Sequence, residues 1–325
     1  MDKKHVYKVA VRCSTYNHAR FIEDALHGFS IQRTDFPVVY LIVDDASTDG
    51  EQDILRTWAK NNLQLNDCDN CHKSLPYGEL ICANHNRQKN AFYVLLLLSE
   101  NHTQSGKGAL KLSYLNEWHN NSEYLAICEG DDYWFHPLKL QRQIFFLDNH
   151  PDYTMCFHNA FISYEDSTKP AQIFNNINED REVSMSELIA EWLNPTASIV
   201  YRISVEPLFP VKKKIISGDW RRTLHCAACG KIWAMKDVMS CYRITYGTSS
   251  ITSQFSEKSY LMYKQQITIL EGLDDFTKGK YHNVITQYCQ YYGRMAKFLQ
   301  IRNEKGIMWA RFRMPAFYLK KLMEK

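Results

Sequence analysis

Glu129-Gly130-Asp131-Asp132-Tyr133-Trp134 is the stretch from which the rest of this sequence can be interpreted. It follows the apolar run from Tyr124 to Cys128, which predicts a buried strand, and the glycine marks the end of that strand. Two adjacent carboxylates at such a position repel each other unless a cation or strong hydrogen-bond donors neutralise them. Because carboxylate oxygens are hard ligands, Asp131 and Asp132 form a candidate site for Mg²⁺ or Mn²⁺; an acidic surface turn is the alternative.

A second pair of carboxylates follows another predicted strand. The apolar run from Val38 to Val43 ends in Asp44 and Asp45, and a predicted helix comes after them. Ser47 or Asp49 is expected to cap that helix, but capping does not explain Asp44 and Asp45. Ligands of open α/β sheets bind at the carboxyl ends of the strands, so both acidic pairs are expected at a binding edge.

The first predicted strand, residues 6–13, also leads into polar residues. Residues 14–17 form a polar turn, and a helix is predicted from 19 to 32. The free N–H groups at the start of such a helix can bind an anion or the edge of a nucleotide. Residues 92–98 are apolar throughout, as expected for a central strand of a parallel sheet.

The remaining patterns predict further helices and strands. A helix is expected at 137–149, a strand at 153–164, a helix after Trp220 to about residue 229 and a short strand at 231–234. From residue 256 onward the apolar residues recur at helical spacing, which predicts a helical C-terminal extension.

Composition limits the classes of protein that this chain can belong to. The chain has 325 residues, 45% of them hydrophobic, which is enough for one large domain with an appendage or for two domains. No apolar run approaches the roughly 20 residues of a membrane span, and the N-terminus lacks the apolar core of a signal peptide. The ten cysteines have no framework spacing, so we predict free thiols and a cytoplasmic location.

The C-terminal segment is strongly basic. Residues 294–325 contain nine lysines and arginines against two glutamates, with aromatic and aliphatic residues among them. This segment is expected either to contact an anionic membrane surface, on the inner face of the membrane, or to pack as a helix with a solvated basic face.

Four residues in the predicted irregular segment 62–91 have the spacing of a zinc site. They are Cys68, Cys71, Cys82 and His85. Paired ligands at two-residue gaps suit a tetrahedral ion, whereas the alternative is a set of small buried thiols. Both interpretations stay open at this stage.

Several segments, in this order and spacing, resemble the family 2 glycosyltransferases of GT-A fold. The segments are Val9 to Asn17, Val43 to Gly50, Glu129 to Trp134 with Pro137 to Leu140, Gly218 to Trp220, and Tyr242-Arg243. The resemblance covers about residues 5 to 250. It implies an α/β fold of GT-A type, with a mixed, mainly parallel sheet flanked by helices in residues 1–255 and a helical, basic C-terminal appendage in residues 256–325. Within this domain, residues 1–135 would be the nucleotide-binding half and residues 136–255 the acceptor half.

The resemblance also implies roles for individual residues in donor binding. The residues that would contact the nucleotide-sugar are Thr15, Tyr16, Asn17, Asp44, Asp45, Asp131 and Arg243. Among these, Tyr16 would stack on the base, and one of Asp44 or Asp45 would hold the base and ribose. Asp131 and Asp132 match the metal-binding acidic motif of the family, with Asp132 as the more direct ligand of Mg²⁺ or Mn²⁺.

Catalysis is assigned by the same resemblance. Asp219 matches the general base of inverting members, and Arg243 matches a segment near the diphosphate. Many relatives have a histidine two residues after that arginine, where this chain has Thr245, and the sequence offers no reason to put His225 or His282 in its place.

The function implied is an inverting, metal-dependent glycosyltransferase of hexosyltransferase type. It would move a sugar from a nucleotide-sugar, with UDP-sugars expected, to a glycan or lipid-linked hydroxyl acceptor in cell-surface polysaccharide or glycolipid synthesis. No nucleic-acid partner is expected. The sequence contains no G-x-S-x-G, P-loop or G-x-G-x-x-G motif, which argues against serine hydrolases, P-loop kinases and NAD enzymes. The alternatives are a sugar-nucleotide pyrophosphorylase-like enzyme and a non-catalytic nucleotide- or sugar-binding scaffold.

Overall fold

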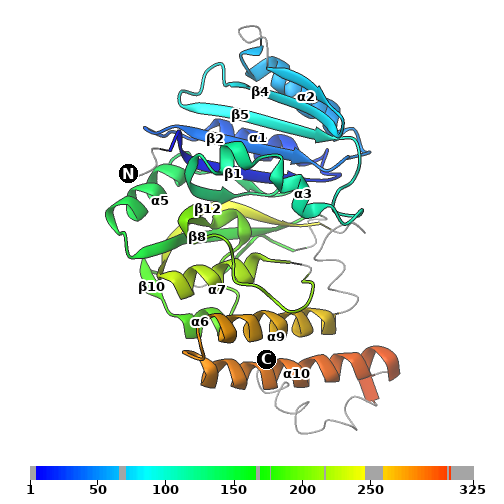
Figure 1. The fold of residues 1–325 in the computed structure, drawn as a ribbon, viewed down its shortest axis with the longest axis vertical. Coiled ribbons are helices and arrows are strands. Elements are labelled where there is room, and N and C mark those ends of the chain that lie inside the picture. Colours follow the sequence, from blue (N-terminus) through cyan, green and yellow to red (C-terminus); the bar gives the residue numbers. More distant parts are fainter. Residues whose placement is uncertain are drawn as a thin grey trace. The chain divides into compact units, whose positions relative to one another are not determined.

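The computed structural model describes residues 5–65, 71–165, 169–175, 177–215, 217–245, 259–305 and 307–308. Contacts between residues divide the chain into two compact units (Figure 1). Unit 1 comprises Met1–Val183, Leu193–Glu206 and Gly230–Arg243, and unit 2 comprises Ser184–Trp192, Pro207–Cys229 and Ile244–Lys325. Two segments before residue 255 therefore group with the C-terminal helices, while the functional division at residues 135 and 255 stays a prediction.

Unit 1 is built on a mixed β-sheet. Within the described ranges, twelve strands form one sheet in the order β10-β12-β8-β11-β6-β1-β2-β5-β4-β3, with β7 paired to β12 and β9 paired to β8. The strands are β1 (Tyr7–Thr15), β2 (Val38–Asp44), β3 (His72–Leu75), β4 (Gly78–Asn84), β5 (Ala91–Leu98), β6 (Ser122–Ile127), β7 (Tyr133–Trp134), β8 (Tyr153–Tyr164), β9 (Gln172–Ile173), β10 (Arg181–Val183), β11 (Val200–Arg202) and β12 (Lys231–Ile244).

The centre of this sheet is parallel. Strand β1 pairs in parallel with β2 and β6, and β2 pairs in parallel with β5. Antiparallel strands flank this core, with β4 against β5 on one side and β11 against β6 on the other. All seven residues of β2 are buried, as an apolar strand covered on both faces requires. The predicted α/β fold with a mixed sheet is confirmed.

Helices of unit 1 cover one face of the parallel core. Helices α1 (Ile22–Ser30), α2 (Glu51–Asn62) and α5 (Lys139–Asn149) place their apolar stripes against alternate residues of β1, β2, β5 and β6. Two short helices, α3 (Gly108–Ser113) and α4 (Asn116–His119), follow β5 and precede β6. The loops that follow the carboxyl ends of the parallel strands carry most of the predicted site residues.

Two segments differ from the sequence-based expectation. The segment predicted to be irregular contains the antiparallel hairpin β3–β4, and β4 extends the sheet beside β5. Only alternate residues of β4, Ile81 and Ala83, are buried, so its apolar pattern is too short to stand out in the sequence. The short strand expected at 231–234 continues to Ile244, because the exposed Lys236 interrupts the apolar pattern but not the backbone pairing.

Unit 2 is helical in the described residues apart from the loops between the helices. It contains α6 (Met185–Ala190), α7 (Asp219–Cys229), α9 (Ser259–Phe276) and α10 (His282–Lys305). Helices α9 and α10 pack along each other (Figure 1), and α6 contacts both α7 and α10. The Trp220 indole N–H donates to the carbonyl of Leu188 at 2.7 Å, which joins α7 to α6. The predicted helical C-terminal part is confirmed for residues 259–305.

Residues 309–325 lie outside the described residues, and with them most of the predicted basic contact with a membrane surface. In the part of the chain that is described, no helix combines the length and apolar character needed to cross a bilayer.

The packing of α1 on β7 gives a test of this fold. Gly28 is buried, and a Cβ atom there would lie 2.5 Å from the carbonyl oxygen and 2.9 Å from the amide nitrogen of Trp134. Because both atoms belong to the backbone, they cannot move aside as a side chain would. We expect Gly28→Ala to lower the free energy of unfolding by about 1–3 kcal/mol, measured by urea denaturation.

Gly108→Ala is the matched control, because nothing lies within 4 Å of a Cβ built at Gly108. It should change the unfolding free energy by less than about 1 kcal/mol. Equal urea midpoints for the two variants would contradict the close packing of α1 on β7.

Candidate functional site

The carboxyl ends of three parallel strands meet at one edge of the sheet in unit 1. Thr15 is the register partner of Asp44, so β1 and β2 end side by side. On the other side of β1, the amide of Gly130 donates to the carbonyl of Ser14 at 3.2 Å. The structure thereby brings together Thr15, Asp44 and the acidic turn at 129–132, which the sequence could place only at separate strand ends.

Gly130 is required for this approach. A Cβ atom at Gly130 would lie 2.1 Å from Thr15 Oγ1 and 3.1 Å from His18 Nδ1. Any other residue would push the acidic turn away from β1. The glycine that ends the strand in the sequence therefore also lets the two loops come into contact.

A buried carboxylate that the sequence did not single out joins the first two loops. Glu51 has no exposed surface, and it accepts hydrogen bonds from Thr15 Oγ1, the amide of His18 and Ser47 Oγ. The two longer of these bonds measure 2.8 Å and 2.9 Å. Burial and repulsion from Asp44 raise the pKa of Glu51, while the donors act in the opposite direction. Glu51 therefore fixes the loop after β1 against the loop after β2.

The polar residues between β2 and α2 also hold the first loop, more than they cap the helix. The N-cap of α2 is Gly50, at φ 92°, and it has no side-chain cap. Ser47 Oγ instead accepts from the amide of Asn17 at 2.8 Å, and Asp49 accepts from the amide of Ala19 at 2.9 Å. Asp49 bonds the helix only at the amide of Glu51, at 3.2 Å. Most of the expected capping interactions are thus replaced by contacts between loops.

Asp44 and Asp45 have different surroundings. Asp45 accepts four hydrogen bonds, from the amides of His102 and Thr103, from Thr103 Oγ1 and from Lys111 Nζ. Burial acts to raise the pKa of Asp45, but the bonds from Thr103 and Lys111 outweigh it and the pKa is lowered. Asp44 Oδ1 accepts from the amide of Ser47 and from Gln52, whereas its buried Oδ2 has no partner in the described structure. Of the two, Asp44 is the one with a carboxylate oxygen that has no hydrogen-bond partner in the described residues.

The acidic turn is held by the end of β12. Asp132 is 2% exposed, and its Oδ1 accepts from the amide of Arg243 at 2.8 Å. Burial, followed by repulsion from Asp131, raises the pKa of Asp132 well above its usual range. Asp131 points toward His18, whose Nε2 lies 3.7 Å from Asp131 Oδ2. A cation bound by Asp131 and Asp132 would offset the repulsion between the two carboxylates.

The guanidinium of Arg243 is engaged within the turn. It donates to the carbonyl of Asp131 at 2.8 Å and to Asp24 at 2.7 Å, and it lies over the rings of Phe21 and Tyr133 at 4.6 Å and 5.0 Å. Its side chain is 11% exposed. In this geometry Arg243 positions the acidic turn, and its predicted contact with the donor stays a prediction.

The acidic turn fits a divalent cation that shares its coordination with a ligand. No lysine or arginine side chain within the described ranges forms an ion pair with Asp131 or Asp132 through a carboxylate oxygen. Three or more metal-binding side chains do not converge anywhere in those ranges. Mg²⁺ is commonly held by one or two carboxylates together with substrate phosphates, and this pair of carboxylates matches that requirement.

Other predicted residues near this edge remain partly exposed. Tyr16 is half-buried and Asn17 adopts φ 57°, with its side-chain oxygen accepting from the amide of Thr48 at 2.8 Å. Tyr242 makes an edge contact with Phe174, and Thr245 is half-buried after β12.

The predicted general base lies in unit 2. Asp219 is the first residue of α7, and its carboxylate accepts from Arg222 Nη1 at 3.0 Å and from Ser217 Oγ at 3.1 Å. The side chain is 24% exposed, so a carboxylate oxygen can be approached from solvent. Within unit 2, the carboxylate of Asp219 is thus held by two hydrogen bonds and remains partly exposed to solvent.

The four residues with zinc-site spacing are only partly covered, because Cys68 lies outside the described residues. Cys71 is buried, and His85 Nδ1 accepts from the amides of Arg87 and Gln88. His85 therefore has one ring nitrogen occupied by its own loop.

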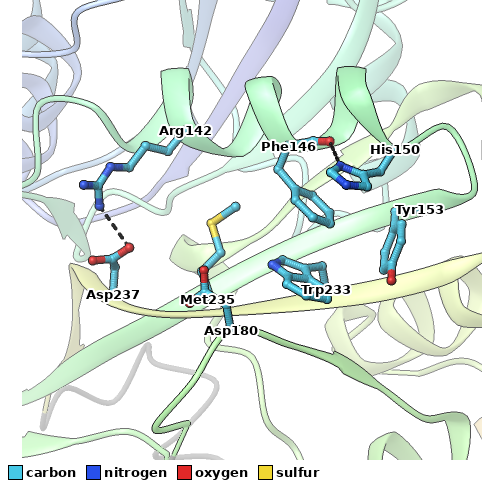
Figure 2. A pocket seen from close by; sticks show the side chains of 8 residues that line it. All are labelled: Arg142, Phe146, His150, Tyr153, Asp180, Trp233, Met235 and Asp237. Carbon is cyan, nitrogen blue, oxygen red and sulfur yellow. Dashed lines mark hydrogen bonds and ion pairs between the residues drawn. The ribbon is translucent and has the colours of Figure 1, made fainter.

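Unit 1 also contains a cavity of about 640 Å³ (Figure 2). Its lining consists of Arg142, Phe146, His150, Tyr153, Asp180, Trp233, Met235 and Asp237. Figure 2 shows Phe146 on α5, and His150 at the end of that helix, facing the strand that carries Trp233. The ring of Phe146 stacks on both His150 and Trp233, at 4.3 Å and 4.9 Å. These rings pack α5 on the sheet, and none of the predicted site residues lines the cavity.

A buried lysine lies behind the acidic turn. Lys139 has no exposed surface, its Nζ has no hydrogen-bond partner in the described part of the chain, and it lies 4.0 Å from the ring centre of Trp134. Burial lowers the pKa of Lys139 to about 7. The contact with the aromatic face of Trp134 favours the charged form, but it is weaker than the loss of hydration.

Lys139 therefore makes stability depend on pH. Its folded-state pKa is depressed, so between about pH 7 and 10 the unfolded chain binds more protons and stability rises with pH. We expect Lys139→Met to be more stable than the wild type at pH 7. This advantage should shrink with rising pH by up to about 1.4 kcal/mol per pH unit, measured by urea denaturation.

Lys60→Met, which replaces an exposed lysine of α2, should show no such trend. A constant difference between Lys139→Met and the wild type from pH 7 to 10 would show that Lys139 keeps an ordinary pKa.

The chain has relatives among sequenced proteins. No family model matches the chain. Uncharacterised proteins of Mycobacterium tuberculosis and Mycobacterium bovis are 34% identical to it over 230 residues, which cover 70% of this chain and 56% of theirs. The chain thus spans little more than half the length of these curated relatives.

Solved structures share the fold over most of the chain. TarS 1-349 of S. aureus in complex with UDP-GlcNAc has a TM-score of 0.57 and 16% identity, covering 96% of this chain and 92% of TarS 1-349. The mannosyltransferase PcManGT of Pyrobaculum calidifontis, in complex with GDP-Man and Mn²⁺, has a TM-score of 0.50 and 15% identity, covering 97% and 81%. At these identities the likeness shows the fold, which is the GT-A-type fold predicted from the sequence.

Proposed function

We propose that this chain is a glycosyltransferase that transfers a sugar from a nucleotide-sugar donor to a hydroxyl acceptor. The observation that carries the proposal is the meeting of Thr15, Asp44 and the acidic turn at one edge of the parallel core. Solved structures of the same fold with UDP-GlcNAc and with GDP-Man and Mn²⁺ support it.

The nucleotide would bind over the ends of β1 and β2. Asp44 Oδ2 is a buried acceptor without a partner in the described residues, and an N–H group of a base can supply the missing donor. Tyr16 is available to stack on that base, with Thr15 and Asn17 holding the loop in position. Asp45 would keep its bonds to the loop after β5 and act by positioning.

The diphosphate would bind at the acidic turn. Asp131 and Asp132 are the residues that would hold Mg²⁺ or Mn²⁺, and Arg243 would keep both in place. When bound, the ion stabilises the negative charge that develops on the leaving diphosphate.

Asp219 would act as the general base. A carboxylate across the sugar ring can remove the proton of the acceptor hydroxyl as it attacks, and a single displacement of this kind inverts the configuration. The partly exposed carboxylate of Asp219, held by Arg222 and Ser217, is suited to this task.

The substrate class and cellular setting extend the proposal. We infer a hexosyltransferase acting in the cytoplasm on a glycan or lipid-linked acceptor for cell-surface polysaccharide or glycolipid, with the basic C-terminus contacting the membrane. A thermal-shift screen of UDP- and GDP-sugars with Mn²⁺ tests the donor class. Stabilisation by one sugar nucleotide supports the proposal, and no shift with any of them contradicts it.

Asp132→Asn tests the acidic turn. It keeps the shape of the side chain but removes the negative charge, so it should reduce Mn²⁺-dependent release of nucleotide from the donor by at least about 100-fold. Release is measured with the donor identified by the thermal-shift screen.

Asp237→Asn is the matched control. Asp237 forms an ion pair of 2.9 Å with Arg142, and both residues line the cavity of Figure 2. This variant should release nucleotide at the wild-type rate. Wild-type activity of Asp132→Asn would exclude the assignment of Asp132 to the ion.

Asp219→Asn separates binding from transfer. Loss of a general base typically costs about 10²–10⁴-fold in rate, whereas the donor does not depend on this side chain for binding. We therefore expect an unchanged donor-induced thermal shift and transfer reduced by that factor, measured by product formation with an acceptor. Asp275→Asn, which alters an exposed ion pair of unit 2, should leave both unchanged, and normal turnover of Asp219→Asn would remove Asp219 as the base.

A further inference from the structure

His18 is placed against the acidic turn by two features of the fold. Asn17 adopts φ 57°, which turns the chain after β1, and Gly130 leaves room where a Cβ atom would lie 3.1 Å from His18 Nδ1. His18 Nε2 then lies 3.7 Å from Asp131 Oδ2, with the two side chains 22% and 19% exposed. No sequence motif singled out His18.

The hydrogen bonds behind His18 determine where its ring carries a proton. Thr15 Oγ1 donates its single hydrogen to Glu51, so toward His18 the hydroxyl oxygen can only accept. His18 Nδ1 lies 3.1 Å from this oxygen and therefore donates to it. In the neutral ring, Nε2 then presents a lone pair toward Asp131.

A lone pair and a carboxylate oxygen that face each other repel unless a proton or a metal cation lies between them. Ligand atoms of Mg²⁺ and Mn²⁺ lie about 2.1 Å from the ion, so neighbouring ligands are separated by roughly 3 Å. The distance of 3.7 Å between His18 Nε2 and Asp131 Oδ2 is close to this separation. Metal-bound histidines usually donate their other ring N–H to an acceptor that fixes the ring, as His18 does through Thr15 and Glu51.

The geometry points to His18 Nε2 as a ligand, beside Asp131, of the divalent cation at the acidic turn. This inference rests on the proposed function, because Asp132, the donor diphosphate and water would fill the remaining coordination positions. In the described residues the three side chains do not converge on one point, so they would do so only around an ion that the donor brings. It also selects between the two ions. A ligand set with an imidazole nitrogen binds Mn²⁺ more tightly than Mg²⁺, which prefers oxygen ligands alone.

Electron spin echo envelope modulation of Mn²⁺ bound to the full chain, with UDP or GDP present, tests the ligand directly. We expect modulation from a directly bound ¹⁴N nucleus in the wild type and its loss in His18→Gln. The dissociation constant of Mn²⁺ should rise at least about 10-fold in His18→Gln, and also in Glu51→Gln, which weakens the support of the ring. His72→Gln is the matched control, because His72 is exposed and pairs with Glu79 on the β3–β4 hairpin.

The outcomes separate this inference from the function on which it rests. Bound Mn²⁺ without ¹⁴N modulation in the wild type overturns the role of His18 and leaves the glycosyltransferase proposal intact. Unchanged Mn²⁺ affinity in His18→Gln would also overturn the role of His18 without affecting the glycosyltransferase proposal. Failure of the wild type to bind either nucleotide or Mn²⁺ overturns both, and the wild-type spectrum decides even if a variant does not fold.

Discussion

The buried carboxylate of Glu51 is the constraint on which the candidate site depends. A carboxylate without exposed surface is costly unless donors satisfy its oxygens, and here the donors come from the loops after β1 and β2. Hydrogen bonds to a charged acceptor are stronger and shorter than neutral ones, so these bonds fix both loops. Thr15, His18 and Ser47 all take their positions from this one side chain.

The acidic turn depends on a different part of the chain. Its backbone joins β1 through the amide of Gly130, while the amide and guanidinium of Arg243 hold Asp132 and the carbonyl of Asp131. Strand β7, which follows the turn, pairs with β12, and this register brings Arg243 of β12 beside the turn. The parallel core thus supplies the edge, and the antiparallel flank fixes the acidic residues on it.

The sequence was sufficient to predict the strands whose residues are buried without interruption. The apolar runs of β2 and β5 predicted these strands because nearly all of their residues are buried, on both faces of the sheet, and the glycine before Asp131 marked the strand end correctly. Glu51 could not be recognised, because an acidic residue in the first turn of a helix is favoured by the helix dipole in any protein. Likewise, Asp45 differs from Asp44 through its bonds from His102, Thr103 and Lys111, and sequence spacing does not show that this distant loop returns to β2.

Several bonds that join the loops of the candidate site connect distant segments. Thr15 and Glu51 are 36 residues apart, Asp45 and Lys111 are 66 apart, and Asp132 and Arg243 are 111 apart. Contacts of such long range form slowly during folding, since each must first overcome the entropy of closing a large loop. No fragment of the chain can hold this arrangement before the central strands have paired. Nucleotide affinity would therefore appear only at the end of folding, and binding would report that the whole of unit 1 has formed.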